Sequence, residues 1–272
     1  MSLEETKQLL RTHRIAPNKL LGQNFMVEPS LYSKLCEYAS LSASDVVLDA
    51  GAGFGFLSCF LADKCKAVVA VEKDPRVVEV LCDQAKCLSN VVVIEGDVLK
   101  AALPDFNKVI AIPPYYLSSR LVELLLERKI DCAVLIVQKE FANRLNAAVG
   151  SEDYGWLTVL IHRQMDVALR DDVAKDMFFP QPTVDSVIVR LKPWNKNRFE
   201  VRDEGLFKQT TKWLFTQRNK KLAKAIAPFL RSSLKLSKQE AENAAASLPF
   251  KDKRPRELSP EQFGAVADAV AR

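Results

Sequence analysis

The amino-acid sequence predicts an α/β fold, in which helices cover both faces of a parallel sheet, followed by a smaller all-helical domain. Between residues 46 and 148, short apolar segments alternate with segments of helical periodicity. The apolar segments are apolar throughout, which is typical of strands buried on both faces of a parallel sheet. From residue 203 onward the pattern is mostly helical. A chain of 272 residues can form one large domain or two smaller ones, so two domains are expected.

The predicted elements follow this order along the chain. Residues 3–14 form a short helix, residues 18–25 a loop that contains Gly22, and residues 29–39 a second helix. Five strands then follow, at residues 46–49, 67–71, 91–94, 109–112 and 133–137. Helices are predicted between or after these strands, at residues 56–64, 75–87, 119–128 and 139–148.

Two further strands are predicted at residues 165–169 and 186–191, on either side of a proline-containing loop. We expect them to form an antiparallel pair at the edge of the sheet. The segment Pro193–Asn197 is typical of a linker, which divides the chain into domains at residues 1–192 and 193–272. Helices are expected in the second domain, with breaks at the prolines because proline cannot donate a helical hydrogen bond. These prolines are Pro228, Pro249, Pro255 and Pro260.

Composition excludes several classes of protein. Hydrophobic residues make up 48% and charged residues 27% of the chain, which is ordinary for a globular protein. No apolar run approaches the roughly 20 residues of a transmembrane helix, and the charged N-terminus lacks the apolar core of a secretory signal. A cytoplasmic protein is therefore expected. The 6 cysteines form no C-x-x-C pair and there are only 2 histidines, so we expect reduced cysteines, no metal site and no histidine-dependent hydrolase.

The charge is unevenly distributed. The chain has a net charge of +5, but residues 191–272 carry 18 Lys and Arg against 9 Asp and Glu. The preceding residues carry 21 against 25, and no acid occurs between Gly205 and Gln239. This pattern indicates that the basic C-terminal part meets a polyanion. Candidate contacts are the basic residues Arg218, Lys220, Lys221 and Lys224. The alternative interpretation is an ordinary solvated helix face.

Glycines or acids follow three successive predicted strands. Asp49-Ala50-Gly51-Ala52-Gly53-Phe54-Gly55 follows the first strand, Glu72 ends the second, and Gly96-Asp97 follows the third. Glycines allow a ligand to approach the backbone, and ligands of open α/β sheets bind at the carboxyl ends of strands. Glu72 is placed to accept hydrogen bonds from ribose hydroxyls, and Asp97 from an exocyclic amine of adenine. Taken singly, each feature is also compatible with a plain turn or a surface acid.

Two aromatic motifs are candidates for binding a flat substrate. Ile112-Pro113-Pro114-Tyr115 follows the fourth strand, and its two prolines form a stiff turn whose carbonyls are free to point into a site. Phe178 and Phe179 precede the loop that contains Pro180 and Pro182. Aromatic rings from both segments would offer stacking faces. A strand-ending turn and ordinary core packing of phenylalanine are the alternatives.

These motifs occur in a recognisable order. Leu21-Gly22-Gln23-Asn24-Phe25, the Asp49–Gly55 segment, Glu72, Gly96-Asp97, Pro114-Tyr115 and Phe178–Ser186 follow one another along the chain. Together they resemble the adenine N6-dimethyltransferases of small-subunit ribosomal RNA and the related erythromycin-resistance methyltransferases. The resemblance extends over about residues 10–260 and includes the closing segment Lys251–Pro260.

The resemblance implies a Rossmann-like, seven-stranded class I methyltransferase domain and S-adenosyl-L-methionine as the cofactor. The cofactor-binding residues that it implies are Gln23, Asn24, Met26, Gly51, Gly53, Glu72, Asp97 and Val98. Tyr115 and Phe178 would stack on the target adenine, and Ile112 and Pro113 would lie at its amine. The implied substrate is small-subunit ribosomal RNA, within an immature small ribosomal subunit, and the implied state is a monomer. Two methyl groups on adjacent adenines near the 3′ end are expected.

Ile112 departs from the family pattern. The family has Asn at this position, and the oxygen of that side chain accepts a hydrogen bond from the target amine. Ile112 has no acceptor, and neither do the side chains of Ala111 and Pro113, although the Pro113 carbonyl remains available. This departure motivates one alternative, an RNA-binding ribosome-assembly factor with weak or no activity. A separate option is methylation of adenines in another nucleic acid such as DNA.

Overall fold

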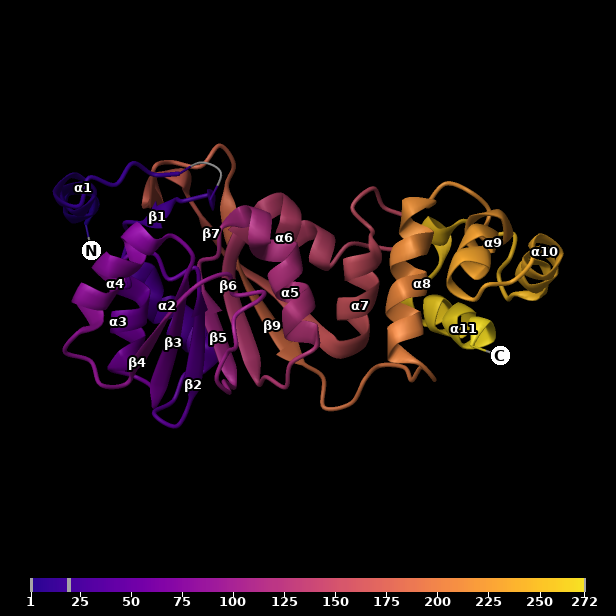
Figure 1. The fold of residues 1–272 in the computed structure, drawn as a ribbon, viewed down its shortest axis with the longest axis horizontal. Helices are drawn as coiled ribbons and strands as arrows, with labels where there is room; N and C mark the ends of the chain where they lie inside the picture. Colours follow the sequence, from indigo (N-terminus) through magenta and orange to yellow (C-terminus); the bar gives the residue numbers. More distant parts are fainter. Residues whose placement is uncertain (1, 19–20, 272) are drawn as a thin grey trace. The chain divides into compact units, whose positions relative to one another are not determined.

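The computed structural model describes residues 2–18 and 21–271 (Figure 1). The chain divides into two compact units. The first consists of residues 1–142 and 167–193, and the second of residues 143–166 and 194–272. The sequence-based division into two continuous segments differs from this grouping, because residues 143–166 pack with the C-terminal segment.

A seven-stranded sheet forms the centre of the first unit, in the order β4-β3-β2-β5-β6-β9-β7. The first five strands in this order are parallel, and β9 runs antiparallel to β6. The order reverses between β2 and β5, which is where open α/β sheets bind their ligands. The strand bounds are β2 (Val46–Ala50), β3 (Ala67–Glu72), β4 (Val91–Glu95), β5 (Lys108–Ala111), β6 (Cys132–Gln138), β7 (Met165–Val173) and β9 (Ser186–Pro193).

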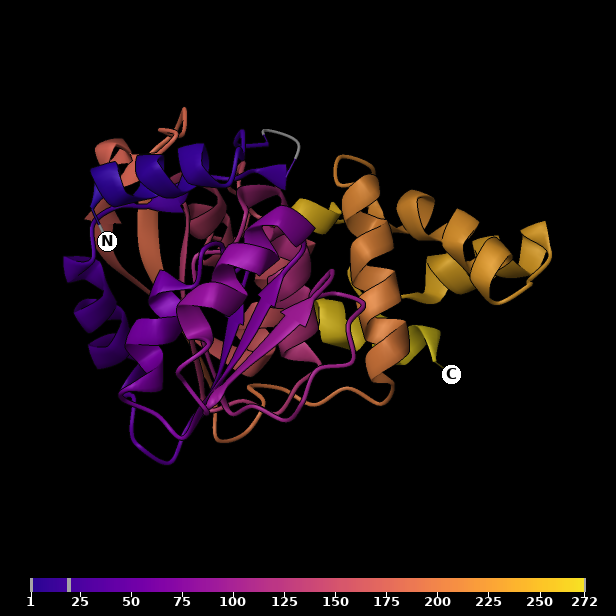
Figure 2. The ribbon, with the colours of Figure 1, turned by 60° about the vertical axis from the view of Figure 1, so that its left-hand side comes forward.

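Helices lie on both sides of this sheet (Figure 2). One face packs against α2 and α3 through a cluster that includes Leu35, Leu61 and Ile136. Neighbouring strand residues that point to the other face, such as Leu48 and Leu135, are equally buried. Burial on both faces explains why β2, β3, β5 and β6 are largely apolar. The expectation fails for β4, which is rich in valine but lies at the edge of the sheet and is only partly buried, with Val92 48% exposed. The helices of this part are α1 (Leu3–Thr12), α2 (Ser30–Ala39), α3 (Phe56–Ala62), α4 (Pro75–Ala85), α5 (Ser118–Leu126) and α6 (Lys139–Leu145).

A second, two-stranded sheet was not predicted. Strand β1 (Phe25–Met26) pairs antiparallel with β8 (Phe178–Phe179), so that Phe25 lies opposite Phe179 and Met26 opposite Phe178. Strands of two residues carry no detectable alternation of apolar and polar residues, which explains why the pattern does not reveal them. The pairing holds the N-terminal segment against the loop that follows β8.

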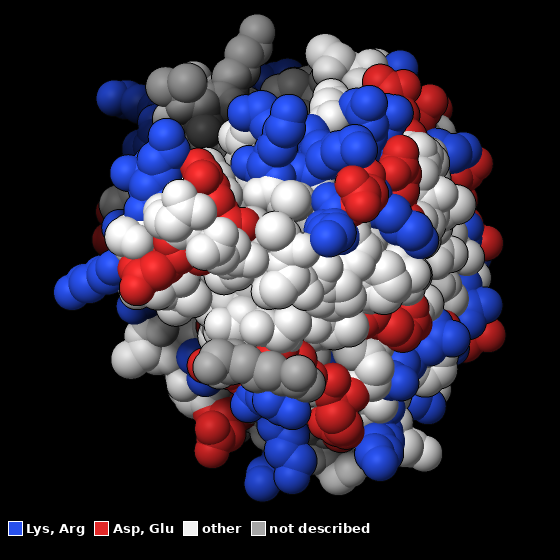
Figure 3. All heavy atoms as spheres, turned by 90° about the vertical axis from the view of Figure 1, so that its right-hand side faces the viewer, with Lys and Arg blue, Asp and Glu red and all other residues white. Residues whose placement is uncertain are grey.

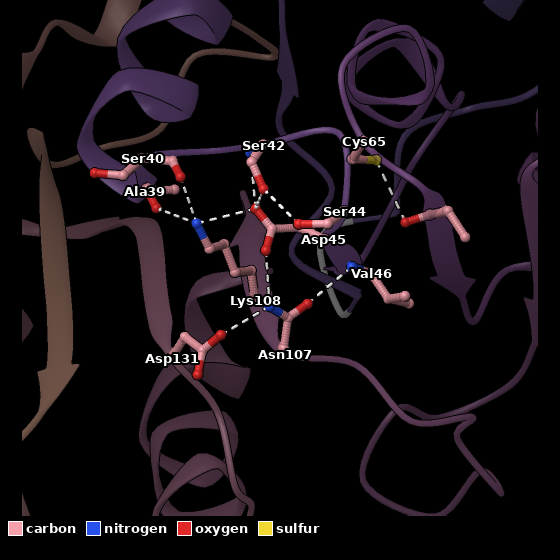
Figure 4. Close-up of polar contacts among 11 residues, drawn as sticks. Ala39, Ser40, Ser42, Ser44, Asp45, Val46, Cys65, Asn107, Lys108 and Asp131 are labelled. Atoms are coloured by element: carbon pink, nitrogen blue, oxygen red, sulfur yellow. Dashed lines mark hydrogen bonds and ion pairs between the residues drawn. The ribbon is translucent and has the colours of Figure 1, made fainter.

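A polar network links the amino-terminal ends of several strands, at the edge of the sheet opposite their carboxyl-terminal ends (Figure 4). The buried Lys108 ammonium lies 3.0 Å from Asp45 Oδ2 and donates to the backbone carbonyls of Ala39 (2.8 Å) and Ser40. The Asn107 side chain donates to Asp45 at 2.7 Å and to Asp131 at 2.8 Å. Burial alone would raise the pKa of Asp45, but the hydrogen bonds from Asn107, Ser42 and Lys108 outweigh it and lower that pKa. The network links the end of α2 to the starts of β2, β5 and β6.

The second unit is helical apart from its connecting segments. It contains α7 (Trp156–Gln164), α8 (Glu204–Thr216), α9 (Leu222–Ser233), α10 (Lys238–Ser247) and α11 (Pro260–Val270). The Arg163 side chain joins α7 to α8: although it is only 1% exposed, its guanidinium donates to both Glu204 carboxylate oxygens, at 2.7 and 2.6 Å. The Tyr154 hydroxyl donates to the Leu258 carbonyl at 2.8 Å. These contacts explain why residues 143–166 group with the C-terminal helices.

Two expectations for this region need correction. Helix α7 was not predicted, because Leu157, Thr158, Val159, Leu160 and Ile161 are all buried and an evenly apolar segment lacks helical periodicity. The predicted break at Pro228 is wrong, since Pro228 lies inside α9. An internal proline costs a helix about 3 kcal/mol. That cost is offset here by an apolar face that buries Leu222, Ala225, Ile226, Phe229 and Leu230.

Among the described residues, no helix combines the length and the apolar character that crossing a bilayer would require.

Candidate functional site

Three adjoining cavities lie at the carboxyl ends of β2, β3 and β5 in the first unit, with empty volumes of about 450, 360 and 410 Å³. We name them the central cavity, which contains Tyr115 and Phe178, the Asp97 cavity and the Asp49 cavity. Gly51 lines all three, so they form one continuous cleft.

The glycine loop after β2 forms the floor of this cleft. Gly51 has φ +83°, and a Cβ at this position would lie 2.7 Å from Pro114 Cδ. The backbone amides of Gly51 and Ala52 both donate to the Val71 carbonyl, at 2.8 and 3.0 Å. A side chain at position 51 would therefore displace the proline turn. Glycine at this position thus allows the proline turn to lie against the loop backbone, which lines all three cavities.

Glu72 lies between the central cavity and the Asp97 cavity. Its Oε2 accepts from the Gly53 amide at 3.0 Å, and its Oε1 accepts from the amides of Lys73 and Asp74 at 2.8 and 2.9 Å. These three donors fix the carboxylate, which has further lone pairs for a ligand hydroxyl. The position agrees with the predicted contact to ribose.

Asp97 and Val98 lie at the far end of the cleft, beside β4. Asp97 Oδ1 accepts from the Leu99 amide at 3.1 Å, and Oδ2 lies 3.4 Å from Lys73 Nζ. Partial burial acts to raise the pKa of Asp97, but the Leu99 amide and the Lys73 charge outweigh it and lower that pKa. The carboxylate therefore remains an acceptor for an amine, beside the apolar Val98 side chain, which is 4% exposed.

Asp49 lines the third cavity from the end of β2. It is 1% exposed and accepts from the Ser58 hydroxyl at 2.6 Å. Burial is the main cause that raises the pKa of Asp49 to about 7; the hydrogen bond from Ser58 opposes this, and the charge of Glu72 adds to it. Asp49 is thus a carboxyl whose protonation changes near neutral pH.

The raised pKa of Asp49 predicts that the free energies of unfolding of the wild type and of Asp49→Asn differ by an amount that depends on pH. Between about pH 4 and pH 7, Asp49 is ionised in the unfolded chain but protonated in the folded one. The folded state then binds more protons, so the contribution of Asp49 to the free energy of unfolding falls as pH rises. We expect the wild type to lose stability relative to Asp49→Asn across this window and not above it. Urea unfolding at a series of pH values measures the difference, and a difference independent of pH would contradict the prediction.

The N-terminal segment closes one side of the cleft. The Gln23 side chain donates to Asp74 at 2.9 Å and accepts from the Asn18 amide at 2.7 Å, so it also ties the segment to the start of α4. Asn24 lines the central and Asp49 cavities, and Met26 lines the Asp49 cavity. The Phe25 ring stacks on Phe54 of the glycine loop, with 4.3 Å between centroids.

Residues after β5 and in β8 form a further part of the wall of the central cavity. Ile112, Pro113, Tyr115 and Phe178 all line it. Ile112 is the first residue beyond the strand, which ends at Ala111 rather than at Ile112, and it packs on the core cluster that contains Phe178. The structure thus brings the predicted cofactor-binding and catalytic residues into a single cleft.

Sequence reasoning missed Ser58 and Ser186. The Tyr115 and Ser186 hydroxyls lie 2.6 Å apart, and Ser186 is fully buried at the start of β9. Burial raises the pKa of Tyr115, although the contact with Ser186 opposes the shift, so Tyr115 remains a neutral phenol. Ser186 is the last residue of the motif that starts at Phe178, but no local signal joins it to a residue 71 positions away.

The predicted RNA-binding residues lie in the second unit and differ in their contacts. Arg218 donates to the carbonyls of Ser151 and Glu152, both at 3.0 Å, and therefore holds a loop of its own unit. Lys221 lies 3.2 Å from Asp252. Lys220 and Lys224 are both exposed. Figure 3 shows Lys and Arg side chains gathered in groups, with acidic side chains among some of them.

A family model described as ribosomal RNA adenine dimethylase matches residues 15–250, which include the whole cleft. The chain belongs to this family.

Curated members of the dimethylase family are similar over most of their length. The protein named "Probable ribosomal RNA small subunit methyltransferase A" of Methanosarcina mazei is 38% identical over 250 residues, which cover 91% of either chain. Ribosomal RNA small subunit methyltransferase A of Clostridium acetobutylicum is 32% identical, with 98% of each chain covered.

Two solved structures with the dimethylase fold are also similar. A dimethyladenosine transferase from Plasmodium falciparum has a TM-score of 0.74 at 26% identity, with 89% of this chain and 95% of that chain covered. The 23S rRNA methyltransferase ErmE has a TM-score of 0.64 at 26% identity, with 92% and 100% covered. The predicted family and the class I methyltransferase fold are confirmed, and the protein is an S-adenosylmethionine-dependent methyltransferase.

The cleft fits this cofactor. It offers a floor without a side chain at Gly51, a fixed carboxylate at Glu72, and an acceptor beside an apolar surface at Asp97 and Val98. These features match the amino-acid, ribose and adenine parts of the molecule respectively.

Proposed function

We propose that this protein methylates the N6 amine of adenines in small-subunit ribosomal RNA, and that it adds two methyl groups to adjacent adenines near the 3′ end. The observation that carries the proposal is the continuity of the cleft: the predicted cofactor-binding residues and the aromatic residues Tyr115 and Phe178 line adjoining cavities. The names of the curated relatives support the small subunit as the source of the RNA.

The residues of the cleft act mainly by holding the cofactor and the target adenine in position for methyl transfer. The bound cofactor supplies an electrophilic methyl group on a sulfonium. Gln23, Asn24 and Met26 would close over it from the N-terminal segment. Gly51 would lie against its methionine part, Gly53 would also contact it, and Glu72 would hold its ribose. Asp97 and Val98 would hold its adenine. Orientation of the two reactants supplies most of the rate enhancement in such a direct displacement.

The target adenine would leave its stack in the RNA and enter the central cavity. There Tyr115 and Phe178 would hold its faces, and the Pro113 carbonyl would accept one N–H of the amine. In this position the amine would accept the methyl group that the bound cofactor supplies, and its nitrogen would give up a proton to solvent. The Ile112 side chain cannot accept a hydrogen bond, although Ile112 lines the same cavity.

The second unit, residues 143–166 and 194–272, would hold the RNA backbone by phosphate contacts. This unit carries the segment from Gly205 to Gln239, which has nine basic residues and no acid. The partner would be an immature small ribosomal subunit in the cytoplasm, with the protein acting as a monomer.

The direct test is transfer of labelled methyl groups to small ribosomal subunits that lack the modification. We expect label in N6-methylated adenines after digestion of the RNA to nucleosides, and none with Glu72→Ala. Binding of subunits without any labelled adenine would instead support the assembly-factor alternative. Label on DNA in competition with subunits, at the same salt concentration, would support the other alternative.

Salt dependence tests the role of the basic residues. We expect Lys220→Ala/Lys224→Ala to reduce the slope of log affinity for RNA against log salt by about 1.4 to 1.8, because each phosphate contact contributes about 0.7 to 0.9. Lys221→Ala is the matched control, with a smaller effect because Lys221 already pairs with Asp252. An unchanged slope in Lys220→Ala/Lys224→Ala would show that these two lysines do not contact RNA phosphates.

A further inference from the structure

Tyr116 is an exposed aromatic residue at the edge of the cleft, and none of the roles described above uses it. Its side chain is 55% exposed, the largest exposed fraction among the large hydrophobic residues of the described chain. A single exposed ring is normal on a protein surface. This one differs because it lines the Asp97 cavity, together with Leu21, Val98, Pro114 and Leu117.

The local backbone explains why Tyr115 and Tyr116 face different cavities. Residues Tyr115–Leu117 form a 3₁₀ turn, which has three residues per turn, so successive side chains point about 120° apart. Tyr115 lines the central cavity and contacts Ser186, and Leu117 is buried. The Tyr116 side chain points in the third direction and lies at the edge of the Asp97 cavity.

The N-terminal segment supports the ring in this position. A Cβ at Gly22 would lie 3.3 Å from Tyr116 Cδ1 and 3.3 Å from Pro114 Cβ. The ring therefore packs against the Gly22 backbone, and only a residue without a side chain leaves this space. Gly22 has φ +61°, which also favours glycine.

The Asp97 cavity has the chemical features that recognise a flat heteroaromatic ring with an exocyclic amine. Val71, Val98 and Leu117 are buried apolar residues that line it, and the Asp97 carboxylate is an acceptor at one side. The Lys73 ammonium, 3.4 Å from Asp97, keeps that carboxylate charged. The buried apolar residues would cover one face of a bound heteroaromatic ring. An aromatic side chain at the edge of the cavity could stack on the other face.

We propose that Tyr116 covers the adenine ring of S-adenosylmethionine by stacking on it, so that consecutive tyrosines serve the two adenines of the reaction: Tyr115 the target and Tyr116 the cofactor. This inference rests on the proposed function for the placement of the cofactor's adenine at Asp97 and Val98.

Calorimetric titration with S-adenosylhomocysteine and with adenosine, without RNA, tests the proposal. Stacking of one base on an aromatic side chain corresponds to a roughly tenfold to hundredfold change in affinity. We expect Tyr116→Ala to raise the Kd for both ligands by at least about tenfold. Tyr116→Phe keeps the ring and should bind within about twofold of the wild type. Equal losses for both ligands would locate the contact at the nucleoside that they share.

The possible outcomes separate this inference from the proposed function. If the wild type binds both ligands and Tyr116→Ala binds them equally well, the inference is wrong and the methyltransferase function stands. If RNA affinity falls in Tyr116→Ala while the affinity for S-adenosylhomocysteine does not, the ring contacts the RNA and the inference is also wrong. If the wild type binds neither ligand, the cofactor site itself is refuted.

Discussion

Ile112→Asn is expected to increase kcat for adenine methylation by about a hundredfold. A correctly placed polar group at a reacting centre typically changes the rate by roughly 10² to 10³. Ile112 lines the central cavity with Pro113 and Tyr115, so an amide oxygen at this position would face the target amine. With two acceptors, the amine nitrogen is more readily drawn out of conjugation with the adenine ring toward the attacking geometry.

The measurement is single-turnover transfer of labelled methyl groups to small subunits. Ile112→Leu is the matched control, because leucine has nearly the shape of asparagine but accepts no hydrogen bond, and we expect its rate to stay within a few-fold of the wild type. An Asn variant that binds cofactor and RNA normally but is no faster than the Leu variant would show that the second acceptor does not limit the reaction.

The same experiment addresses the assembly-factor alternative. If the wild type transfers no methyl groups while Ile112→Asn does, the natural chain would be an RNA-binding factor that has lost one catalytic group. The family relationship favours an enzyme, because the other cofactor-binding and aromatic positions of the pattern are present in the cleft.

Lys108→Met is expected to lower the free energy of unfolding by about 3 kcal/mol, the lower end of the range for breaking a buried ion pair. Lys108 and Asp45 have side chains that are 10% and 7% exposed, and their charged groups lie 3.0 Å apart. Removal of the ammonium leaves the Asp45 carboxylate buried without its counter-charge and leaves the carbonyls of Ala39 and Ser40 without their donor (Figure 4). The hydrogen bonds from Asn107 and Ser42 remain, which keeps the loss from being larger.

Urea unfolding of a double-mutant cycle measures this effect. Asp45→Asn/Lys108→Met removes both charges, and we expect it to recover part of the stability lost in Lys108→Met, because no unpaired charge is then buried. Lys34→Met is a suitable control, since the ion pair of Lys34 with Asp171 is exposed and exposed pairs contribute only about 0 to 1 kcal/mol. Equal losses for Lys34→Met and Lys108→Met would contradict the prediction.

The order of strands and helices was predictable where burial leaves a clear pattern in the sequence. The apolar runs that became β2, β3, β5 and β6 are buried on both faces, and the glycines and acids at the ends of β2, β3 and β4 lie at one edge of the sheet. Helix α7 was not predictable, because its apolar residues are buried around most of its surface. The break assigned to Pro228 was wrong because packing of the α9 face outweighs the local cost of proline.

The sequence by itself indicated the family through a resemblance of motifs, and it determined most of the apolar strands and the glycines and acids at their ends, because these follow from local chemistry. Only the tertiary structure decided how those residues are supported. The contacts of Tyr115 with Ser186, of Gln23 with Asp74 and of Lys108 with Asp45 join positions far apart in the chain. Such contacts depend on how strands and loops are brought together in space, and no local pattern of residue types specifies them.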